Sequence, residues 1–171
     1  MYYRTRLYLA AEWDGDKDLI DQIRYWKDHD FYSLDFSDAH DLMQSRDTSL
    51  PCSIKHSLAQ RMSGSKTFLL VVGDKTKTVT KGKCQFCKNY YSSLDWCSSG
   101  NSVNNKSFIE YECEKALRDG LRIVVLYNSY KVDREKCPAI VRYEGLHIAA
   151  YHYENYTKKW NYQDIKNAIN G

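Results

Sequence analysis

The chain has 171 residues, which suits one domain with a single sheet and the helices that cover it, so we expect one domain over residues 1–171. The net charge of +3 is spread along the sequence, and nucleic acid is therefore not an expected partner. Near the N-terminus, the uncharged stretch at residues 7–11 is too short for a signal peptide or a membrane span, and we expect a cytoplasmic protein without membrane contact.

The first third of the chain predicts two strands and two helices. Residues 5–11 form a short apolar run suited to a buried strand, and 12–16 are a polar turn that ends at a plausible helix cap, Asp16. Residues 31–38 alternate as a second strand, and a polar loop follows through Thr48. Ser49 is the expected N-cap of the next helix, with Pro51 in its first turn. The apolar positions with helical spacing are Leu19, Ile20, Ile23 and Trp26, then Ile54, Leu58 and Met62.

The remainder of the chain predicts three more strands. Residues 68–72 and 121–128 are apolar runs typical of strands covered on both faces, and 145–153 is a weaker fifth strand. Helices are expected at about 106–119, ending at Gly120, and near the C-terminus. Between the third strand and the helix, residues 74–105 lack a helical pattern and are expected to form a small cysteine-containing lobe.

Strands that alternate with helices indicate a parallel sheet with helices on both faces. Five strands suit a flavodoxin-like three-layer sandwich with strand order 2-1-3-4-5, in which ligands bind beyond the carboxyl ends of the strands. The segments that follow strands one, two and three are therefore where we expect the functional site.

Three segments, at residues 6–23, 57–76 and 107–128, resemble in their order the bacterial branch of the Toll/interleukin-1 receptor (TIR) family. The last contains a serine, an aromatic residue and then a glutamate, followed by a helix, a glycine and an apolar strand. This branch includes the NAD-consuming subunits of Thoeris antiphage systems. The resemblance implies cleavage of the nicotinamide–ribose bond of NAD⁺, an ADP-ribose-derived signalling nucleotide, self-association through TIR–TIR contacts and a separate effector protein.

The resemblance places the family's catalytic glutamate at Glu112, four residues after Phe108, where many members have tryptophan. One carboxylate is chemically adequate, because it can stabilise the oxocarbenium-like ribose while nicotinamide leaves as a neutral group. The helical spacing also separates Glu112 from Glu110 and Glu114, since Glu112 borders the apolar stripe of the helix. We expect the other two acids to be solvated helix charges.

Residues of the first loop are candidates for NAD⁺ binding. Asp14 and Asp16 could accept hydrogen bonds from ribose hydroxyls, although ordinary turn and helix-cap chemistry is the favoured explanation of both. Trp13 could stack on a base or serve as a packing residue. Ala10 and Ala11 leave room for a ligand at the strand exit, and Phe108 completes the predicted binding set.

The six cysteines suggest thiols or metal ligands if the chain is in the reducing cytosol. Cys84 and Cys87, with Cys97 farther on, have the spacing of part of a zinc site, but the fourth ligand would have to come from Cys113, Cys137 or His147. Unligated thiols are therefore the default interpretation, and zinc is the alternative. A redox CxxC is less favoured, because it is expected to open a helix after a strand.

Two other functions compete with the enzyme. A TIR-like scaffold without catalysis would use the same fold for protein interactions. A basic and aromatic set in the lobe suggests a nucleic-acid surface, but its charge is modest, and a solvated loop or a pyrophosphate contact explains it better. That set consists of Lys75, Lys77, Lys81, Lys83, Tyr90 and Tyr91.

Overall fold

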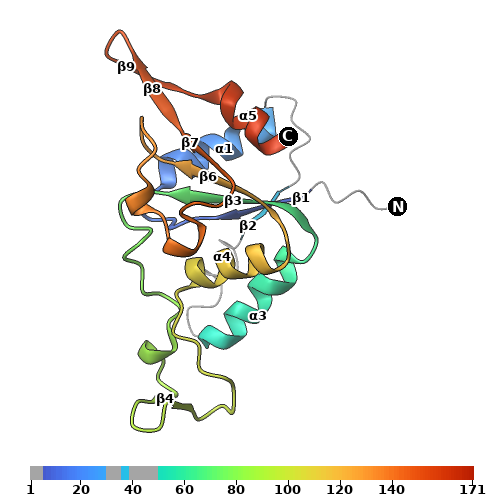
Figure 1. Cartoon of the computed structure of the whole chain (residues 1–171), viewed down its shortest axis with the longest axis vertical. Helices are drawn as coiled ribbons and strands as arrows, with labels where there is room; N and C mark the ends of the chain where they lie inside the picture. Colours follow the sequence, from blue (N-terminus) through green and yellow to red (C-terminus); the bar gives the residue numbers. More distant parts are fainter. Residues whose placement is uncertain (1–5, 30–35, 39–49) are drawn as a thin grey trace.

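A computed structural model describes residues 6–29, 36–38 and 50–171 of the chain. Its main sheet has five parallel strands in the order β2-β1-β3-β6-β7 (Figure 1). The predicted α/β class with a parallel sheet is confirmed. The strands are β1 (Arg6–Ala10), β2 (Phe36–Asp38), β3 (Ser65–Val72), β6 (Arg122–Tyr127) and β7 (Leu146–Ala149).

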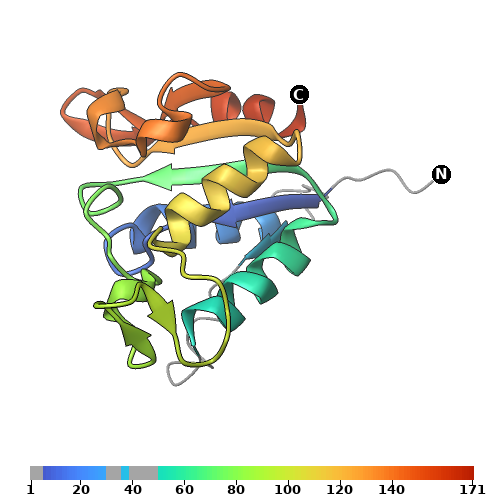
Figure 2. The ribbon, with the colours of Figure 1, turned by 60° about the horizontal axis from the view of Figure 1, so that its bottom comes forward.

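Helices cover both faces of this sheet, because successive strand residues point to opposite sides. On β1, Tyr8 packs in a cluster with α3 and α4, whereas Leu7 and Leu9 pack in a second cluster with α1 and α5. Figure 2 shows the start of α4 on the side toward which the β3 arrow points, which is the carboxyl edge of the sheet. The helices are α1 (Lys17–His29), α3 (Pro51–Met62), α4 (Phe108–Arg118) and α5 (Tyr162–Asn170).

The segment between β3 and α4 forms a lobe at the lower end of the molecule in Figure 1. It contains a short 3₁₀ turn, η1 (Cys84–Phe86), and a small antiparallel hairpin of β4 (Tyr90–Tyr91) and β5 (Trp96–Cys97). Its regular elements are therefore short, in agreement with the absence of a helical pattern in the sequence.

The predicted fifth strand at 145–153 is correct only in its first part, which is β7. After Ala150 the chain leaves the sheet, and β8 (Tyr151–Glu154) pairs with β9 (Thr157–Trp160) in a separate antiparallel hairpin. This hairpin projects at the end of the molecule opposite the lobe (Figure 1). Between β6 and β7 the chain makes two further 3₁₀ turns, η2 (Arg134–Lys136) and η3 (Ala139–Val141).

Several helix boundaries differ slightly from the prediction. The N-cap of α3 is Leu50, which makes no side-chain cap hydrogen bond, and Ser49 lies outside the described residues, as do 31–35 of the second strand and the loop through Thr48. Gly120 follows the end of α4 with φ of 67°, which explains why a glycine ends this helix.

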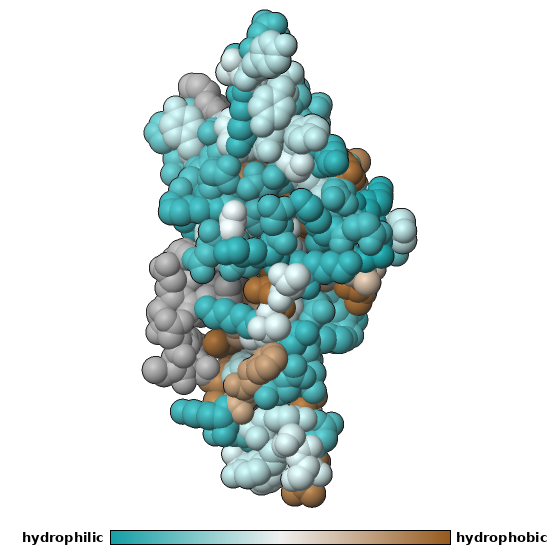
Figure 3. All heavy atoms as spheres, turned by 90° about the vertical axis from the view of Figure 1, so that its left-hand side faces the viewer, coloured by the Kyte–Doolittle hydropathy of each residue, from teal (hydrophilic) through white to brown (hydrophobic). Residues whose placement is uncertain are grey.

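The surface seen in Figure 3 is mainly hydrophilic or intermediate in hydropathy, with hydrophobic atoms in small separate patches. At the top of that view, the β8–β9 hairpin carries polar and aromatic residues. None of the described helices is both long and apolar enough to cross a membrane.

Candidate functional site

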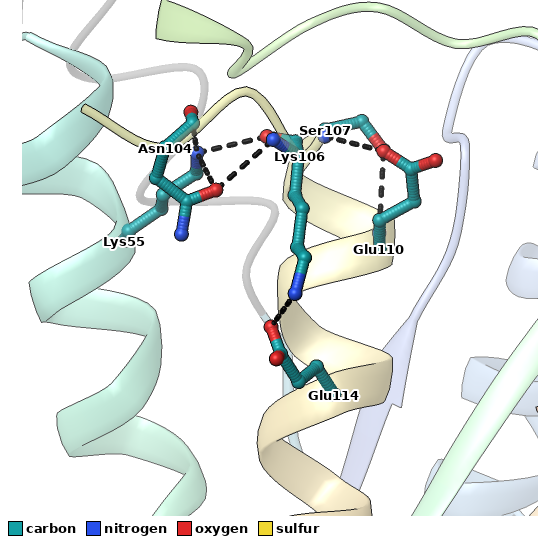
Figure 4. A network of polar contacts seen from close by, with 6 residues as sticks. All are labelled: Lys55, Asn104, Lys106, Ser107, Glu110 and Glu114. Atoms are coloured by element: carbon teal, nitrogen blue, oxygen red, sulfur yellow. Dashed lines mark hydrogen bonds and ion pairs between the residues drawn. The ribbon is translucent and has the colours of Figure 1, made fainter. Parts of the chain in front are cut away.

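The start of α4 is held by a capping box. Ser107, the N-cap, accepts a hydrogen bond from the Glu110 backbone N–H at 3.2 Å, and the Glu110 carboxylate accepts one from the Ser107 N–H at 2.7 Å. The expectation that Glu110 is a solvated charge is therefore wrong, because its carboxylate satisfies a backbone donor that the helix cannot. Glu114 is partly exposed and forms an ion pair with Lys106 (Figure 4).

Glu112 differs from both neighbouring acids because it is buried, with only 3% of its surface exposed. The Tyr8 hydroxyl, from the middle of β1, donates a hydrogen bond to Glu112 Oε1 at 2.5 Å. Burial raises the pKa of Glu112 to about 8, although the Tyr8 hydrogen bond opposes the rise. At pH 7 the Glu112 carboxyl group is therefore mostly protonated in this arrangement.

The segment that precedes the lobe covers the beginning of α4. The Phe108 N–H donates to the Lys81 carbonyl oxygen at 2.9 Å, and the buried Phe108 ring lies against Gly82. A Cβ atom at Gly82 would meet the ring at 2.5 Å, and the φ of 99° at this position also favours glycine. Phe108 is thus a packing residue that joins this segment to the helix of Glu112.

A second polar group lies where β1 and β6 end. Asp16 precedes α1, and its carbonyl accepts the first helical hydrogen bond, from the Ile20 N–H, as expected of a cap. Its side chain turns instead to Asn128, whose amide donates to Asp16 Oδ1 at 3.0 Å and to Asp18 Oδ1 at 2.9 Å. The carboxylate is packed so closely against Gly73 that a Cβ there would lie 2.0 Å from Oδ1.

The other oxygen of Asp16, Oδ2, is buried and has no hydrogen-bond partner among the described residues. Burial raises the pKa of Asp16 to about 6, against the lowering effect of the Asn128 hydrogen bond, and the nearby charges of Glu12, Asp18 and Asp74 add to the rise. Asp16 is therefore a buried, incompletely hydrogen-bonded carboxyl group at the sheet edge where we expected ligand binding.

The remaining predicted binding residues are divided between the core and the surface. Ala10 and Ala11 are buried in the two hydrophobic clusters on opposite faces of the sheet. Trp13 is buried in the cluster of α1, and the Arg24 guanidinium lies 4.6 Å from the centre of its ring. Asp14 is exposed. In this structure Trp13 is therefore a packing residue, which is one of the two roles expected for it.

A shallow hollow of about 550 Å³ opens at the start of α3, beside the lobe. Glu112 is not among its lining residues, and neither is Asp16, so the hollow is distinct from both polar groups. Its described lining residues are Cys52, Ser53, His56, Ser57 and Asn101.

All six cysteines are free thiols. Within residues 6–29, 36–38 and 50–171, no three histidine, cysteine or acidic side chains gather closely enough to hold a metal ion. Cys113 and Cys137, two of the candidates for a fourth zinc ligand, are buried in the cluster of α3 and α4. His147, the third candidate, lies beside Tyr127, with its Nδ1 atom 2.8 Å from the hydroxyl oxygen.

Three residues that position these groups were not anticipated from the sequence. Tyr8 lies within an apolar strand pattern, and its role depends on the helix α4 that packs against the strand. Asn128 carried a usable signal, since it is the first polar residue after a buried strand at the carboxyl edge. Lys55 of α3 donates to the Asn104 and Lys106 carbonyl oxygens beside the start of α4, and nothing in the apolar pattern of its helix indicates this role.

The fold is thus an α/β domain whose parallel sheet presents polar groups near its carboxyl edge. Comparison with known proteins adds no closer classification: no family model matches the chain, and no curated protein is significantly similar to it.

Proposed function

We propose that the chain is a flavodoxin-like, TIR-like domain that cleaves the nicotinamide–ribose bond of NAD⁺, with Glu112 as the catalytic residue. The observation that carries this proposal is the separation of the three acids at the start of α4. Glu110 is used by the helix cap and Glu114 by an ion pair, whereas Glu112 is buried against β1 and held by the Tyr8 hydroxyl. Glu112 is a carboxyl group held in the protein interior, one turn into a helix that begins at the carboxyl edge of the sheet, and buried carboxyl groups near that edge are candidates for charge stabilisation.

The chemistry requires little else of the protein. Departure of nicotinamide leaves positive charge on the ribose, and an ionised Glu112 would stabilise that charge. Water or a hydroxyl group of the same nucleotide would then give an ADP-ribose-derived product. No metal is needed for this step. We expect the product to act as a signal on a separate effector protein in antiphage defence.

Glu112 must become exposed and ionised before it can stabilise the ribose cation. With 3% exposure it does not meet a substrate, and with a pKa of about 8 it is mostly neutral at pH 7. Movement of the segment at Lys81 and Gly82, which covers the start of α4, would admit both NAD⁺ and water and would lower this pKa. Such an enzyme would be inactive at rest, and self-association or infection would supply the trigger.

The test is to incubate the purified protein with NAD⁺, alone and with lysate of phage-infected source cells, and to measure nicotinamide release. With lysate of infected cells we expect release by the wild type and by Glu114→Gln, and none by Glu112→Gln with unchanged circular dichroism. Equal release by Glu112→Gln would overturn the assignment of the residue. Mass spectrometry of the product would distinguish linear, cyclic and conjugated ADP-ribose.

A non-enzymatic scaffold is the second candidate, and one observation favours it. The β8–β9 hairpin ends in Tyr156, which is fully exposed in a left-handed conformation with φ of 61°. An aromatic residue at such a position is costly and makes sense as a contact for another protein. Absence of cleavage in every activated lysate, together with oligomers that Tyr156→Gly disrupts, would support the scaffold.

A further inference from the structure

Cys84 and Cys87 lie at the two ends of one tight turn in the lobe. Cys84 opens the 3₁₀ turn η1, and the Cys87 N–H donates to the Cys84 carbonyl oxygen at 2.8 Å. Residues at the two ends of a turn closed in this way have Cα atoms less than about 7 Å apart, and disulfides span about 4.4 to 6.8 Å. The turn therefore holds the two residues at a separation that a disulfide can span. Both thiols are free in this structure.

Cys84 is enclosed by polar groups of the segment before α4 and of α3. Its Sγ atom, in a residue only 7% exposed, accepts a hydrogen bond from the Asn104 backbone N–H at 3.2 Å. The ammonium group of Lys55 is nearby: burial lowers the pKa of Lys55, and its interaction with the Cys84 thiol is the largest effect opposing that change. Cys84 is thus held in place within the turn by the Asn104 N–H and lies behind the surface of the lobe.

Cys87 is the more accessible member of the pair. It is half-buried, and its Sγ atom is 3.5 Å from the Asn89 backbone nitrogen. A reagent from solution would therefore meet Cys87 first, with Cys84 behind it in the same turn. This arrangement of one open thiol and one protected thiol is typical of attacking and resolving cysteines.

We propose that Cys84 and Cys87 form a reversible dithiol–disulfide pair that responds to low-molecular-weight disulfides. The Cys87 thiolate attacks one sulfur of the reagent, the reagent's S–S bond breaks, and one reagent thiol leaves. The Cys84 thiolate then attacks Cys87 Sγ in the mixed disulfide and releases the second reagent thiol. Two protein thiols are thereby oxidised and one reagent disulfide is reduced, with the two thiol protons passing to the leaving thiolates.

Formation of the Cys84–Cys87 disulfide would change the hydrogen bonds of Asn104, close to the start of α4. The Cys84 N–H donates to the Asn104 carbonyl oxygen at 3.1 Å, and Lys55 Nζ donates to that same oxygen at 2.9 Å and to the Lys106 carbonyl oxygen at 2.8 Å. Figure 4 shows how this network leads from Lys55 to the helix cap at Ser107. A Cys84 side chain turned toward Cys87 leaves the Asn104 N–H without its acceptor and loosens the segment that precedes the cap.

The other thiols do not share this turn. Cys97 lies on β5, where it pairs with Tyr90 of β4, and the experiment tests it as a competing partner. Cys113, on α4, and Cys137 are buried in the hydrophobic cluster of α3 and α4. A resident zinc ion would also explain the spacing of Cys84 and Cys87, and the experiment separates that possibility from the proposal.

The experiment equilibrates the full chain in glutathione buffers of increasing oxidised fraction, blocks free thiols by alkylation and maps the peptides by mass spectrometry. We expect a Cys84–Cys87 disulfide that dithiothreitol reverses, that persists in Cys97→Ser and that is absent from Cys87→Ser. Alkylation of both residues at every ratio would overturn the proposal. So would a disulfide from either of them to Cys97, or stoichiometric zinc that protects both thiols until it is chelated.

Hydrogen exchange of the wild-type chain supplies a readout that needs no variant to fold. Oxidation should accelerate exchange in the peptide at 104–112 by roughly fivefold, as loss of one hydrogen bond implies, and leave β3 and β6 unchanged. An unchanged rate at 104–112 in fully oxidised protein would overturn the coupling to α4. Neither measurement uses NAD⁺, so failure of the NAD⁺-cleavage proposal would leave this one standing.

Discussion

The carboxyl group of Glu112 is more easily protonated than an exposed glutamate because the core of α3, α4 and the sheet surrounds it. Its pKa of about 8 compares with 4.5 for an ordinary glutamate. The folded state therefore binds this proton more tightly than the unfolded state does. The stability that Glu112 contributes is fully present below pH 4.5 and is lost as the pH rises through 8.

Replacement of Glu112 by Gln should remove that pH dependence, since Gln stays neutral and can still accept the Tyr8 hydrogen bond. We expect Glu112→Gln to exceed the wild type in free energy of unfolding at pH 9 by roughly 2 to 4 kcal/mol. Urea titrations at pH 5 and pH 9 measure the effect, with Glu114→Gln as a control. A variant less stable than the wild type at pH 9 would contradict it.

Tyr8 is expected to set the pH at which an active Glu112 ionises, because its hydroxyl favours the charged carboxylate. If the NAD⁺-cleaving activity is present, kcat/KM should rise with pH as Glu112 ionises. In Tyr8→Phe the midpoint of that rise should move to higher pH by roughly half a unit to one unit. A midpoint that stays in place or moves to lower pH would show that Tyr8 does not act on Glu112.

Asp16 is a second buried carboxyl group whose raised pKa makes the folded state less stable as the pH rises. Its pKa is raised from 3.8 to about 6, so its contribution to stability is lost as the pH rises through 6. We expect Asp16→Asn to be more stable than the wild type at pH 8 by roughly 1 to 2 kcal/mol. Thermal unfolding across pH 4 to 8 checks this, and Asp14→Asn, at an exposed position, should show no comparable gain.

At the scale of elements, α4 depends on the segments that meet its first turn. The capping box provides hydrogen-bond partners for backbone N–H groups at the start of the helix. The Phe108 ring packs against the backbone of Gly82, in the segment that leads into the lobe. The left-handed backbone at Gly82 and the close ring together leave no room for a side chain. This contact joins the entrance of the lobe to the helix that carries Glu112.

Gly82→Ala should therefore destabilise the protein by roughly 2 to 4 kcal/mol, through backbone strain and overlap with the Phe108 ring. Gly100 is a matched control, because its φ of 74° is also left-handed but its surroundings are open. Gly100→Ala should cost only roughly 1 kcal/mol. Equal losses in chemical denaturation would mean that the Phe108 contact contributes little.

At the scale of the whole molecule, a lysine contributes to the connection between the body and each of the two extensions at its opposite ends. Lys158 of β9 forms an ion pair with Asp18 at 3.1 Å, and Asp18 shares Asn128 with Asp16 at the sheet edge. Lys55, only 4% exposed, ties α3 to the segment between the lobe and α4. The carboxyl edge is thus connected to the hairpin, and the start of α4 to the lobe.

Lys55→Met should release the lobe without unfolding the sheet. Loss of the ammonium removes the donor to the part-buried Lys106 carbonyl oxygen and leaves the Asn104 carbonyl oxygen with the Cys84 N–H alone, at a cost of roughly 2 to 3 kcal/mol. We expect limited proteolysis to cut first between residues 84 and 106, with the peptides of β3 and β6 still protected. Lys159→Met, at an exposed position, is the control, and cleavage that begins in the sheet would contradict the interpretation.

The apolar runs of β3 and β6 and the stripe of α4 were predictable from the sequence, because burial on both faces of a parallel strand requires continuous apolar residues. The split at Ala150 was not. Residues 145–153 carry one pattern throughout, yet β8 pairs with the polar strand β9, and its turn at Asn155 and Tyr156 lacks the glycine that usually marks a hairpin.

The sequence by itself determined the α/β class, the apolar strands and the distinct position of Glu112 on its helix, since all three follow from local periodicity. Only the tertiary structure decided the protonation of Glu112 and Asp16, because each pKa depends on groups brought from distant strands, Tyr8 for Glu112 and Asn128 for Asp16. Tertiary structure likewise brought Cys84 beside Asn104 and Lys55. Spacing along a chain does not specify the dielectric environment or the hydrogen-bond partner that a folded group meets.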